Sequence, residues 1–318
     1  MGIGVKKKII FLWLILIFTV VLGISQGPVN LSFHELLEAN NRQILNLRIA
    51  RVILAILAAS GLSVCGVVLQ ALLLNPLSEP YLLGTSSGAG LAAVIAIVIG
   101  ISGIYTPLAA FVGAILSTLL VYRLSKQRGK VGIQSLILSG VIISIAFSAA
   151  IILLLSISNR ETLQGISWWL WGSLEVFNFK LLFLAGIIVS CGIILTYIFS
   201  QDLNAVSIGE EEALHLGINT ELVKKILFFI VSFITAAIIS VCGIIGFVGL
   251  IVPHISRLII GPNHRRLIPV SCIFASGFMI LCDYFSRTIL APVQIPIGVM
   301  TAIVGAPIFI ILLKKNQV

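Results

Sequence analysis

Charged residues are scarce in this chain: only 10% of its 318 residues are Asp, Glu, Lys or Arg, whereas about 25% is usual in soluble domains. The mean hydropathy is +1.19, and 59% of the residues are hydrophobic. No polar stretch is longer than the segment 201–225. This composition leaves no room for a soluble catalytic module, and it predicts one integral membrane domain, all α-helical, over residues 1–318.

Motifs for catalysis, nucleotide binding and metal binding are also absent. There is no H-E-x-x-H spacing and no Ser/His/Asp set, and "GTSSGAG" at 84–90 is no P-loop because no strand precedes it and no Lys follows. We expect no enzyme activity, no cofactor and no metal site, so any ATP would be bound by another subunit. Five cysteines lack C-x-x-C spacing and are expected to be small buried residues: Cys65, Cys191, Cys242, Cys272 and Cys282.

Long apolar runs, by contrast, recur along the whole chain. A helix of about 20 residues crosses the hydrocarbon core. Ten runs are candidate spans: 9–25, 52–74, 88–101, 106–123, 136–157, 180–200, 224–243, 246–260, 267–284 and 296–313. The first run follows Lys6, Lys7 and Lys8 and can also be interpreted as a cleaved signal peptide, but its length and the sequence "GISQG" favour an uncleaved span.

The basic residues predict the orientation of these spans. With a cytoplasmic N-terminus, six of the 20 Lys and Arg residues fall outside and the others inside, at Lys6, Lys7, Lys8, Arg123, Lys126, Arg128, Lys130, Lys224, Lys225, Arg257, Arg265, Arg266, Lys314 and Lys315. The positive-inside rule therefore favours ten spans with both termini cytoplasmic. The net charge of +9 indicates this topology and contact with anionic membrane lipid, not a nucleic-acid surface.

One stretch, "NPLSEPYLLGTSSGAG" at 75–90, interrupts the apolar pattern between the second and third spans. Non-helical backbone at membrane depth is tolerated where protein buries it or where it faces a water-filled cavity. It is either an ordinary tight loop or part of a pathway wall. The second interpretation gives seven candidate pathway residues, two of them in "VPHISR": Asn75, Pro76, Ser86, Ser87, Gly88, Pro253 and His254.

A short repeat indicates internal symmetry. "SVCG" occurs at 63–66 and at 240–243, and in both copies a proline follows the glycine by ten residues and a second glycine comes eight residues later. Five spans separate the copies, so one would be inverted, with spans 2–5 related to spans 7–10. Chance similarity between small-residue helix faces is the alternative.

The polar insert 201–225 carries a helix pattern from Glu210 to Leu216, between Gly209 and Gly217. Acidic residues fill its first turn, where the helix dipole favours them. A helix this short is marginal alone and needs a surface to pack against. A lipid surface is one candidate, but three successive glutamates oppose an anionic leaflet, which favours a cytoplasmic protein partner.

Three arginines stand on the predicted outer side, against the topological bias: Arg48, Arg51 and Arg287. They are either snorkelling anchors or a docking site for an acidic partner through exposed ion pairs. The acidic residues all fall in or near loops or, like Asp283, near a span end. Ion-coupled carriers usually keep ionisable groups in the membrane.

Six stretches together resemble one known family: "LRIAR" at 47–51, "LNPLSEPYLLGTSSGAG" at 74–90, "GEEEALHLG" at 209–217, "GFVGLIVPHISR" at 246–257, "NHRRLIPVS" at 263–271 and "PIGVMTAIVGAPIFIILL" at 296–313. They are similar to the permease subunits of bacterial type II ABC importers for iron-siderophores, haem and cobalamin. The resemblance covers nearly the whole chain. It implies a ten-helix permease in the bacterial cytoplasmic membrane, paired with a second copy or a paralogue.

The resemblance also implies partners and roles. Two ABC ATPase subunits would bind the cytoplasmic face and an extracellular or periplasmic substrate-binding protein the outer face, where Arg48, Arg51 and Arg287 would receive acidic residues. Coupling to the ATPase would fall to five residues of the insert: Gly209, Glu210, Ala213, Leu216 and Gly217. The loop before the fifth span would narrow the cytoplasmic end, at Gly132, Ile133, Gln134 and Ser135.

The chain departs from the family pattern in the outer loop and before "NPL". Gln294 stands where an acid usually precedes "PIG", Leu74 stands where a basic residue is common, and "GPNH" lacks the usual Asp. The sequence thus predicts the permease of an ATP-driven metal-chelate importer, with ferric siderophore favoured over haem or cobalamin. An ion-coupled secondary transporter acting alone is the alternative.

Overall fold

The computed structural model describes residues 3–28, 31, 33–127 and 130–315. The predicted basic residue Arg128 lies outside the described residues. Seven helices are long and apolar enough to cross a membrane: α1 (Ile3–Ser25), α3 (Arg42–Leu72), α5 (Tyr105–Ser125), α6 (Ile133–Ser156), α8 (Phe179–Ile198), α11 (Thr220–Cys242) and α13 (His264–Thr288). Three shorter apolar helices are α4 (Thr85–Val98), α12 (Val248–Ile260) and α14 (Ile297–Lys315). Each of the ten predicted runs falls on one of these ten helices.

Shorter elements connect the spans. They are α2 (Phe33–Leu37), η1 (Ala39–Asn41), η2 (Pro80–Leu83), α7 (Arg160–Trp171), α9 (Ser200–Val206), α10 (Glu210–His215) and the antiparallel pair β1 (Lys126–Gln127) and β2 (Lys130–Val131). The helix predicted inside the insert is confirmed as α10. The sequence analysis did not predict α2, α7 or α9.

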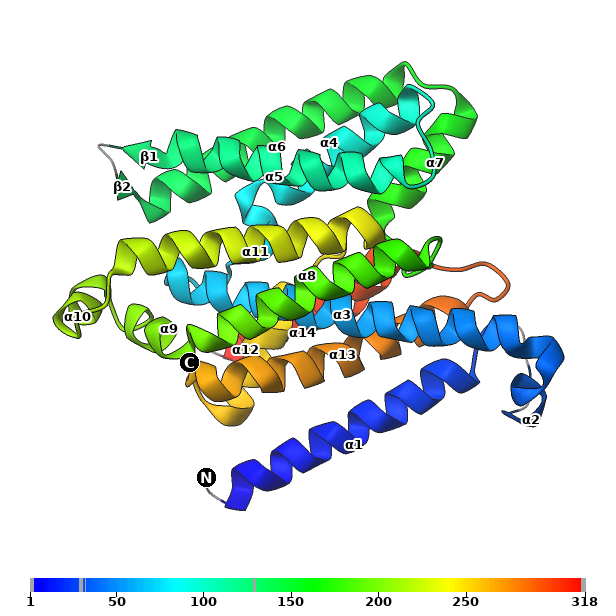
Figure 1. Cartoon of the computed structure of the whole chain (residues 1–318), viewed down its shortest axis with the longest axis horizontal. Helices are drawn as coiled ribbons and strands as arrows, with labels where there is room; N and C mark the ends of the chain where they lie inside the picture. The colour runs from blue at the N-terminus through cyan, green and yellow to red at the C-terminus, as the bar shows by residue number, and fades with distance from the viewer. Residues whose placement is uncertain (1–2, 29–30, 32, 128–129, 316–318) are drawn as a thin grey trace.

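Most of the connecting elements gather at two opposite ends of the bundle, whereas η2 lies inside it (Figure 1). Helices α9 and α10, the β1–β2 hairpin and both chain termini lie at one end, called here the α10 end. Helices α2 and α7 and the connection from α13 to α14 lie at the other, called here the α7 end. Termini at the same end agree with an even number of crossings.

Helix α3 runs through the middle of the bundle and is buried along most of its length. It packs against α1, α8, α11, α12 and α13. Small residues allow this close packing, as is usual between membrane helices. At the tightest crossing, a Cβ added to Gly66 would lie 1.8 Å from the carbonyl oxygen of Gly249 in α12. Only glycine therefore fits at position 66.

The irregular stretch after α3 returns into the bundle. Helix α3 has 31 residues, a length of about 46 Å, and residues 73–84 then lead back to α4, which has only 14. Internal hydrogen bonds satisfy this backbone: Thr85 donates to the Pro80 carbonyl and Ser117 to the Gly84 carbonyl. The Tyr81 hydroxyl donates to the Ile245 carbonyl at 2.7 Å and accepts from the Ile245 amide at 3.0 Å. Protein therefore buries or half-buries residues 78–84, one of the two conditions set out from the sequence, whereas Leu74, Pro76 and Leu77 are exposed.

The order of helix lengths repeats between α3–α6 and α11–α14, because in each set a long helix and an irregular segment precede a short helix. Helices α3 and α11 run in opposite directions between the two ends (Figure 1). The two "SVCG" copies nevertheless do not lie at equivalent positions of the two sets, so the alignment that they predicted is wrong. The first copy lies inside α3, whereas the second ends α11, and Gly84 precedes α4 whereas Gly261 ends α12.

One of the five cysteines is not buried as expected. Cys65, Cys242 and Cys282 are buried and Cys272 is half-buried, but Cys191 is exposed on α8. Its side chain lies on the outer face of a helix long and apolar enough to span a membrane, and a thiol that behaves as a small hydrophobic group is compatible with such a face.

Candidate functional site

An ionic cluster at the α7 end joins helices α3 and α13. Asp283 accepts from Arg51 Nε through Oδ1 at 2.8 Å and from Arg287 Nε through Oδ2 at 2.9 Å. The Asp283 side chain is 1% exposed, that of Arg287 3% and that of Arg51 13%. Buried charges require such partners, since an isolated one would be strongly desolvated. One carboxylate thus fixes two of the three predicted docking arginines.

The arginines make further contacts inside the chain. Arg287 donates to the carbonyls of Gln26 and Gly23, both at 3.1 Å, and Arg48 donates to the carbonyls of Ile24 and Ser25. These carbonyls end α1, where four are left without helical partners. The expectation that these arginines are exposed is therefore wrong: Arg48 and Arg287 are buried and Arg51 is mostly buried. Their role in docking stays a prediction.

A cavity of about 350 Å³ opens beside this cluster. Its walls include Arg48, Arg51, Arg287, Glu175 and Gln294. The Gln294 amide oxygen accepts from Arg51 at 3.2 Å, and the Glu175 carboxylate lies 3.9 Å from the same guanidinium. Gln294 thus supplies an acceptor oxygen at the position where the family usually has an acid. The cavity presents guanidinium groups toward the α7 end, which suits an acidic surface.

At the opposite end, α10 presents exposed side chains. Glu210, Glu211 and Glu212 fill its first turn, and Leu214 and Leu216 are 58% and 68% exposed. Ala213 is fully buried, which seats the helix on the bundle. Glu210 forms an ion pair with Lys224 of α11. Of the predicted coupling residues, Gly209 is the N-cap, Leu216 is the C-cap and Gly217 has the positive φ of +78°.

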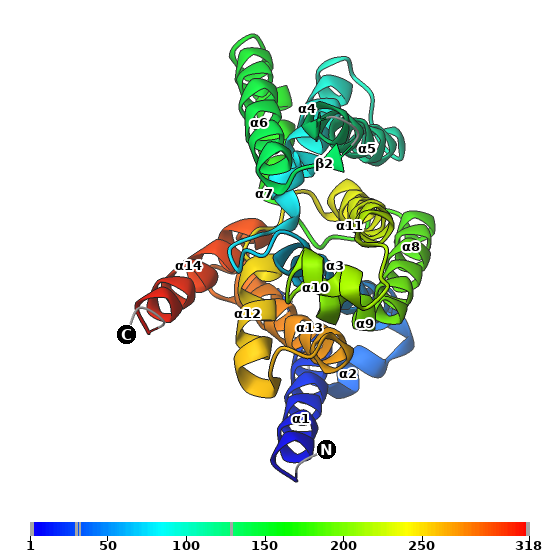
Figure 2. The same ribbon diagram turned by 90° about the vertical axis from the view of Figure 1, so that its left-hand side faces the viewer.

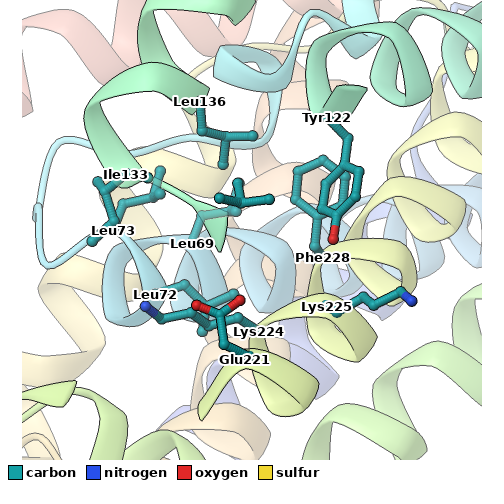
Figure 3. Close-up of a pocket in the computed structure, with 12 residues that line it drawn as sticks. Leu69, Leu72, Leu73, Tyr122, Ile133, Leu136, Glu221, Lys224, Lys225 and Phe228 are labelled. Atoms are coloured by element: carbon teal, nitrogen blue, oxygen red, sulfur yellow. The ribbon is translucent and has the colours of Figure 1, made fainter. Parts of the chain in front are cut away.

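The predicted gate residues begin α6 close to the first turns of α11. Gly132 and Gln134 are exposed, and Ile133 and Ser135 are half-buried. A cavity of about 40 Å³ lies between Gly132 and Ile133, Tyr122 of α5, the end of α3 and the start of α11 (Figure 3). Lys224 lines it as well. The ion pair with Glu210 therefore links α10 to the wall that the start of α6 also lines.

The predicted pathway residues are not alike in their surroundings. Pro76 is exposed, Asn75, Ser86 and His254 are half-buried, and Ser87, Gly88 and Pro253 are buried. Ser87 donates to the Gly84 carbonyl, and a Cβ on Gly88 would lie 2.2 Å from Cβ of Ser117 on α5. Gly88 thus serves a tight helix contact here. Whether these residues line a pathway stays a prediction.

Four residues that contribute to these sites carried no clear sequence signal as site residues: Asp283, Glu175, Lys224 and Tyr81. Asp283 was noted only as an acid near a span end. One of its partners, Arg287, lies four residues further along the same helix, whereas the other, Arg51, lies on α3 and is distant in sequence. In the described part of the chain, no group of three or more His, Cys, Asp or Glu residues is placed to hold a metal ion.

Comparison with known proteins identifies the family of this chain. The model of the FecCD transport family matches residues 15–315. The chain belongs to the FecCD transport family. A hemin transport system permease of Yersinia pestis is 32% identical over 96% of this chain and 95% of its own. A molybdate import system permease of Haemophilus influenzae is 35% identical over 97% of this chain and 96% of its own.

The fold of this FecCD permease also has a close solved counterpart. A metal-chelate type ABC transporter in an inward-facing conformation matches it with a TM-score of 0.90, 32% identity, and coverage of 98% of this chain and 99% of that one. The FecCD permease is thus a multi-pass membrane transport subunit. The two relatives carry chemically different substrates by name, so membership alone does not define the substrate.

Proposed function

We propose that this FecCD permease is the membrane subunit of an ATP-driven importer for a metal chelate, in first place a ferric siderophore, in a bacterial cytoplasmic membrane with both termini cytoplasmic. The likeness over nearly its full length to a metal-chelate transporter carries the proposal. The arginine-lined cavity would receive an acidic substrate-binding protein. Helix α10 would seat in a separate ABC ATPase, and a second permease chain would complete the pore.

The chemistry of the predicted pathway supports this substrate class. Its seven residues are Asn, Ser, Gly, Pro and His, with no Lys or Arg among them. A molybdate dianion would gain from fixed cations along its route. A bulky chelate whose charge is enclosed by its ligand needs only small, weakly interacting walls. This favours a siderophore complex over an oxyanion.

The first test is to tag the chain, extract it gently and identify the proteins that accompany it by mass spectrometry. We expect an ABC ATPase and a substrate-binding protein. The reassembled complex in vesicles should then take up a ferric siderophore only with ATP, and an ionophore should not stop it. Recovery of the chain alone, with ATP-independent uptake that an ionophore abolishes, would establish a secondary transporter instead.

Changing Leu216 to Asp should uncouple the permease from its ATPase. Leu216 is 68% exposed, so the substitution leaves the fold intact but places a carboxylate in the proposed contact. Losing a central apolar contact typically costs about 2 kcal/mol or more, so association should weaken at least tenfold. Binding of the purified ATPase measures this. Gln201→Asp, at an exposed position on α9, is the matched control and should bind normally.

Changing Ser86 to Trp tests the proposed pathway wall. Ser86 is half-buried at the start of α4, so a large ring there should obstruct a bulky chelate and lower uptake about tenfold or more. Ser86→Ala is the control and should transport normally. Gly88→Trp would be uninformative, because it collides with α5 whatever the pathway does. Full uptake by Ser86→Trp at normal expression would remove Ser86 from the pathway.

A further inference from the structure

A groove at the α7 end is lined by the first turns of α5 and α8 and by α11, which packs against both. Two adjoining cavities form it, of about 530 Å³ and 120 Å³. They share the lining residues Pro107, Leu181, Ser240 and Val241. The larger one falls in the range of about 300–1,000 Å³ that is typical of small-molecule sites.

The groove lies within the membrane-spanning part of the protein. The residues of the smaller cavity come from the first turns of α5 and α8 and the last two turns of α11, and all three helices are candidate spans. The larger cavity lies at the ends of these spans, where the connection from α4 to α5 and residues 175–178 also border it. From Leu181 to Ile188 along α8 the groove extends about 10 Å, a depth that stays within one leaflet of a core about 30 Å thick. Helices α6 and α14, the arms with largely uncovered apolar faces, project from a different side of the molecule (Figure 2).

The lining changes from polar to apolar along the groove. The larger, outer cavity is bordered by Ser102, Thr106, Trp169, Glu175 and Asn178. The smaller, inner one is bordered by apolar side chains: Leu108, Phe111, Leu184, Ile188 and Ala237. Among the described residues that line either cavity, Glu175 alone carries a charge. This gradient matches an amphiphile whose polar head lies at the outer end.

We propose that the groove binds a membrane phospholipid, with an acyl chain in the inner cavity and a headgroup ammonium beside Glu175. The surroundings of a groove at this depth are lipid, so the occupant comes from the bilayer. The Glu175 carboxylate is 44% exposed and stands 3.9 Å from the Arg51 guanidinium, so it can also attract an ammonium at the mouth. Phosphatidylglycerol has no ammonium and lacks this contact. The Phe177 ring, 85% exposed, and Trp169 offer aromatic faces that also favour an ammonium.

This site adjoins the arginine-lined cavity. Glu175, Val176 and Phe177 line both, so one short segment separates the lipid headgroup from Arg51. The inference depends only on the membrane placement of the chain and is independent of the transported substrate. Lipid binding and chelate transport can therefore fail separately.

Quenching of Trp169 fluorescence tests the proposal. The chain has four tryptophans, and changing Trp13, Trp168 and Trp171 to Phe leaves Trp169 as the reporter in the outer cavity. The full-length protein is placed in vesicles with increasing fractions of lipid brominated on its acyl chains. A bound lipid should saturate the quenching at low mole fraction, and brominated phosphatidylethanolamine should be preferred over phosphatidylglycerol about fivefold or more.

Four variants define the outcome. A Trp168-only protein, with its reporter exposed on the same helix, should show quenching that rises in proportion to the brominated fraction. Ala185→Phe should fill the inner cavity and remove the saturation, whereas Ser190→Phe, outside the groove on α8, should keep it. Glu175→Gln should keep the saturation and lose the headgroup preference. Proportional quenching of Trp169, or equal or better quenching by phosphatidylglycerol, would overturn the proposal.

Discussion

Replacing Asp283 with alanine should destabilise the permease by about 3–5 kcal/mol, the usual cost of removing one partner of a buried ion pair. The carboxylate contacts Arg51 and Arg287 at 2.8 and 2.9 Å, and all three side chains are almost inaccessible. Its loss leaves the guanidinium groups of Arg51 and Arg287 buried close together, without the carboxylate that pairs with both. Thermal unfolding in detergent should show a large drop in melting temperature.

Two matched variants distinguish the charge from the shape. Asp283→Asn keeps the volume but loses the charge, and should be nearly as damaging. Glu175→Gln should change stability little, because Glu175 is 44% exposed and stands 3.9 Å from Arg51. A double variant, Asp283→Leu with Arg287→Leu, should recover part of the loss, since it removes one of the two charges left without the carboxylate. An Asp283→Ala protein that melts like the parent would show that the buried ion pairs do not stabilise the fold.

Changing Gly66 to Ala should be at least as damaging, because the added methyl has no space. Its carbon would lie 1.8 Å from the carbonyl oxygen of Gly249, a backbone atom that cannot rotate aside. Helices α3 and α12 would have to separate along their crossing and lose the contacts on either side. Effects above about 4 kcal/mol are expected only from such mechanisms. We expect little folded, monodisperse protein after extraction.

Gly277 provides the matched control for this substitution. It lies inside α13, and the nearest atoms to an added Cβ are 3.8 Å away, on Ile15 and Thr19. Gly277→Ala should be tolerated and can gain stability, since alanine in a helix is favoured over glycine by about 1 kcal/mol. Equal yields and melting temperatures for the two variants would mean that the α3–α12 crossing is not as tight as described.

The spans could be predicted from the sequence because hydropathy is a property of each segment alone. All ten runs coincide with helices, and α10 was predicted from its glycines and its acidic first turn. Helix α7 was missed because its polar residues, such as Arg160 and Glu161, break the apolar pattern of a short amphipathic segment. The "SVCG" repeat predicted the wrong alignment of the two halves, because four small residues can lie in the middle of a helix, as in α3, or at its end, as in α11.

The sites were only partly predictable, for a different reason. Position and charge, and then the family resemblance, singled out Arg48, Arg51 and Arg287, but nothing local indicates that Arg51 meets Asp283 across 232 positions of sequence. The same holds for Lys224 and Glu210, although they are only 14 apart. The sequence shows Gln294 in place of an acid, but only the structure shows that its amide oxygen accepts a hydrogen bond from Arg51. Pairings of this kind depend on the tertiary fold.

The hydroxyl of Tyr81 has a mechanical consequence. It holds both the amide and the carbonyl of Ile245, and so joins the irregular segment 73–84 to the one that precedes α12. In the described part of the chain, the only two non-glycine residues with positive φ, Leu74 and Phe247, lie within these two segments. The two irregular segments are thus joined into one unit, referred to here as a brace, and each contains a residue in a sparsely populated backbone conformation. A permease braced in this way would open and close by tilting whole helices around its centre, with the bending confined to the two ends.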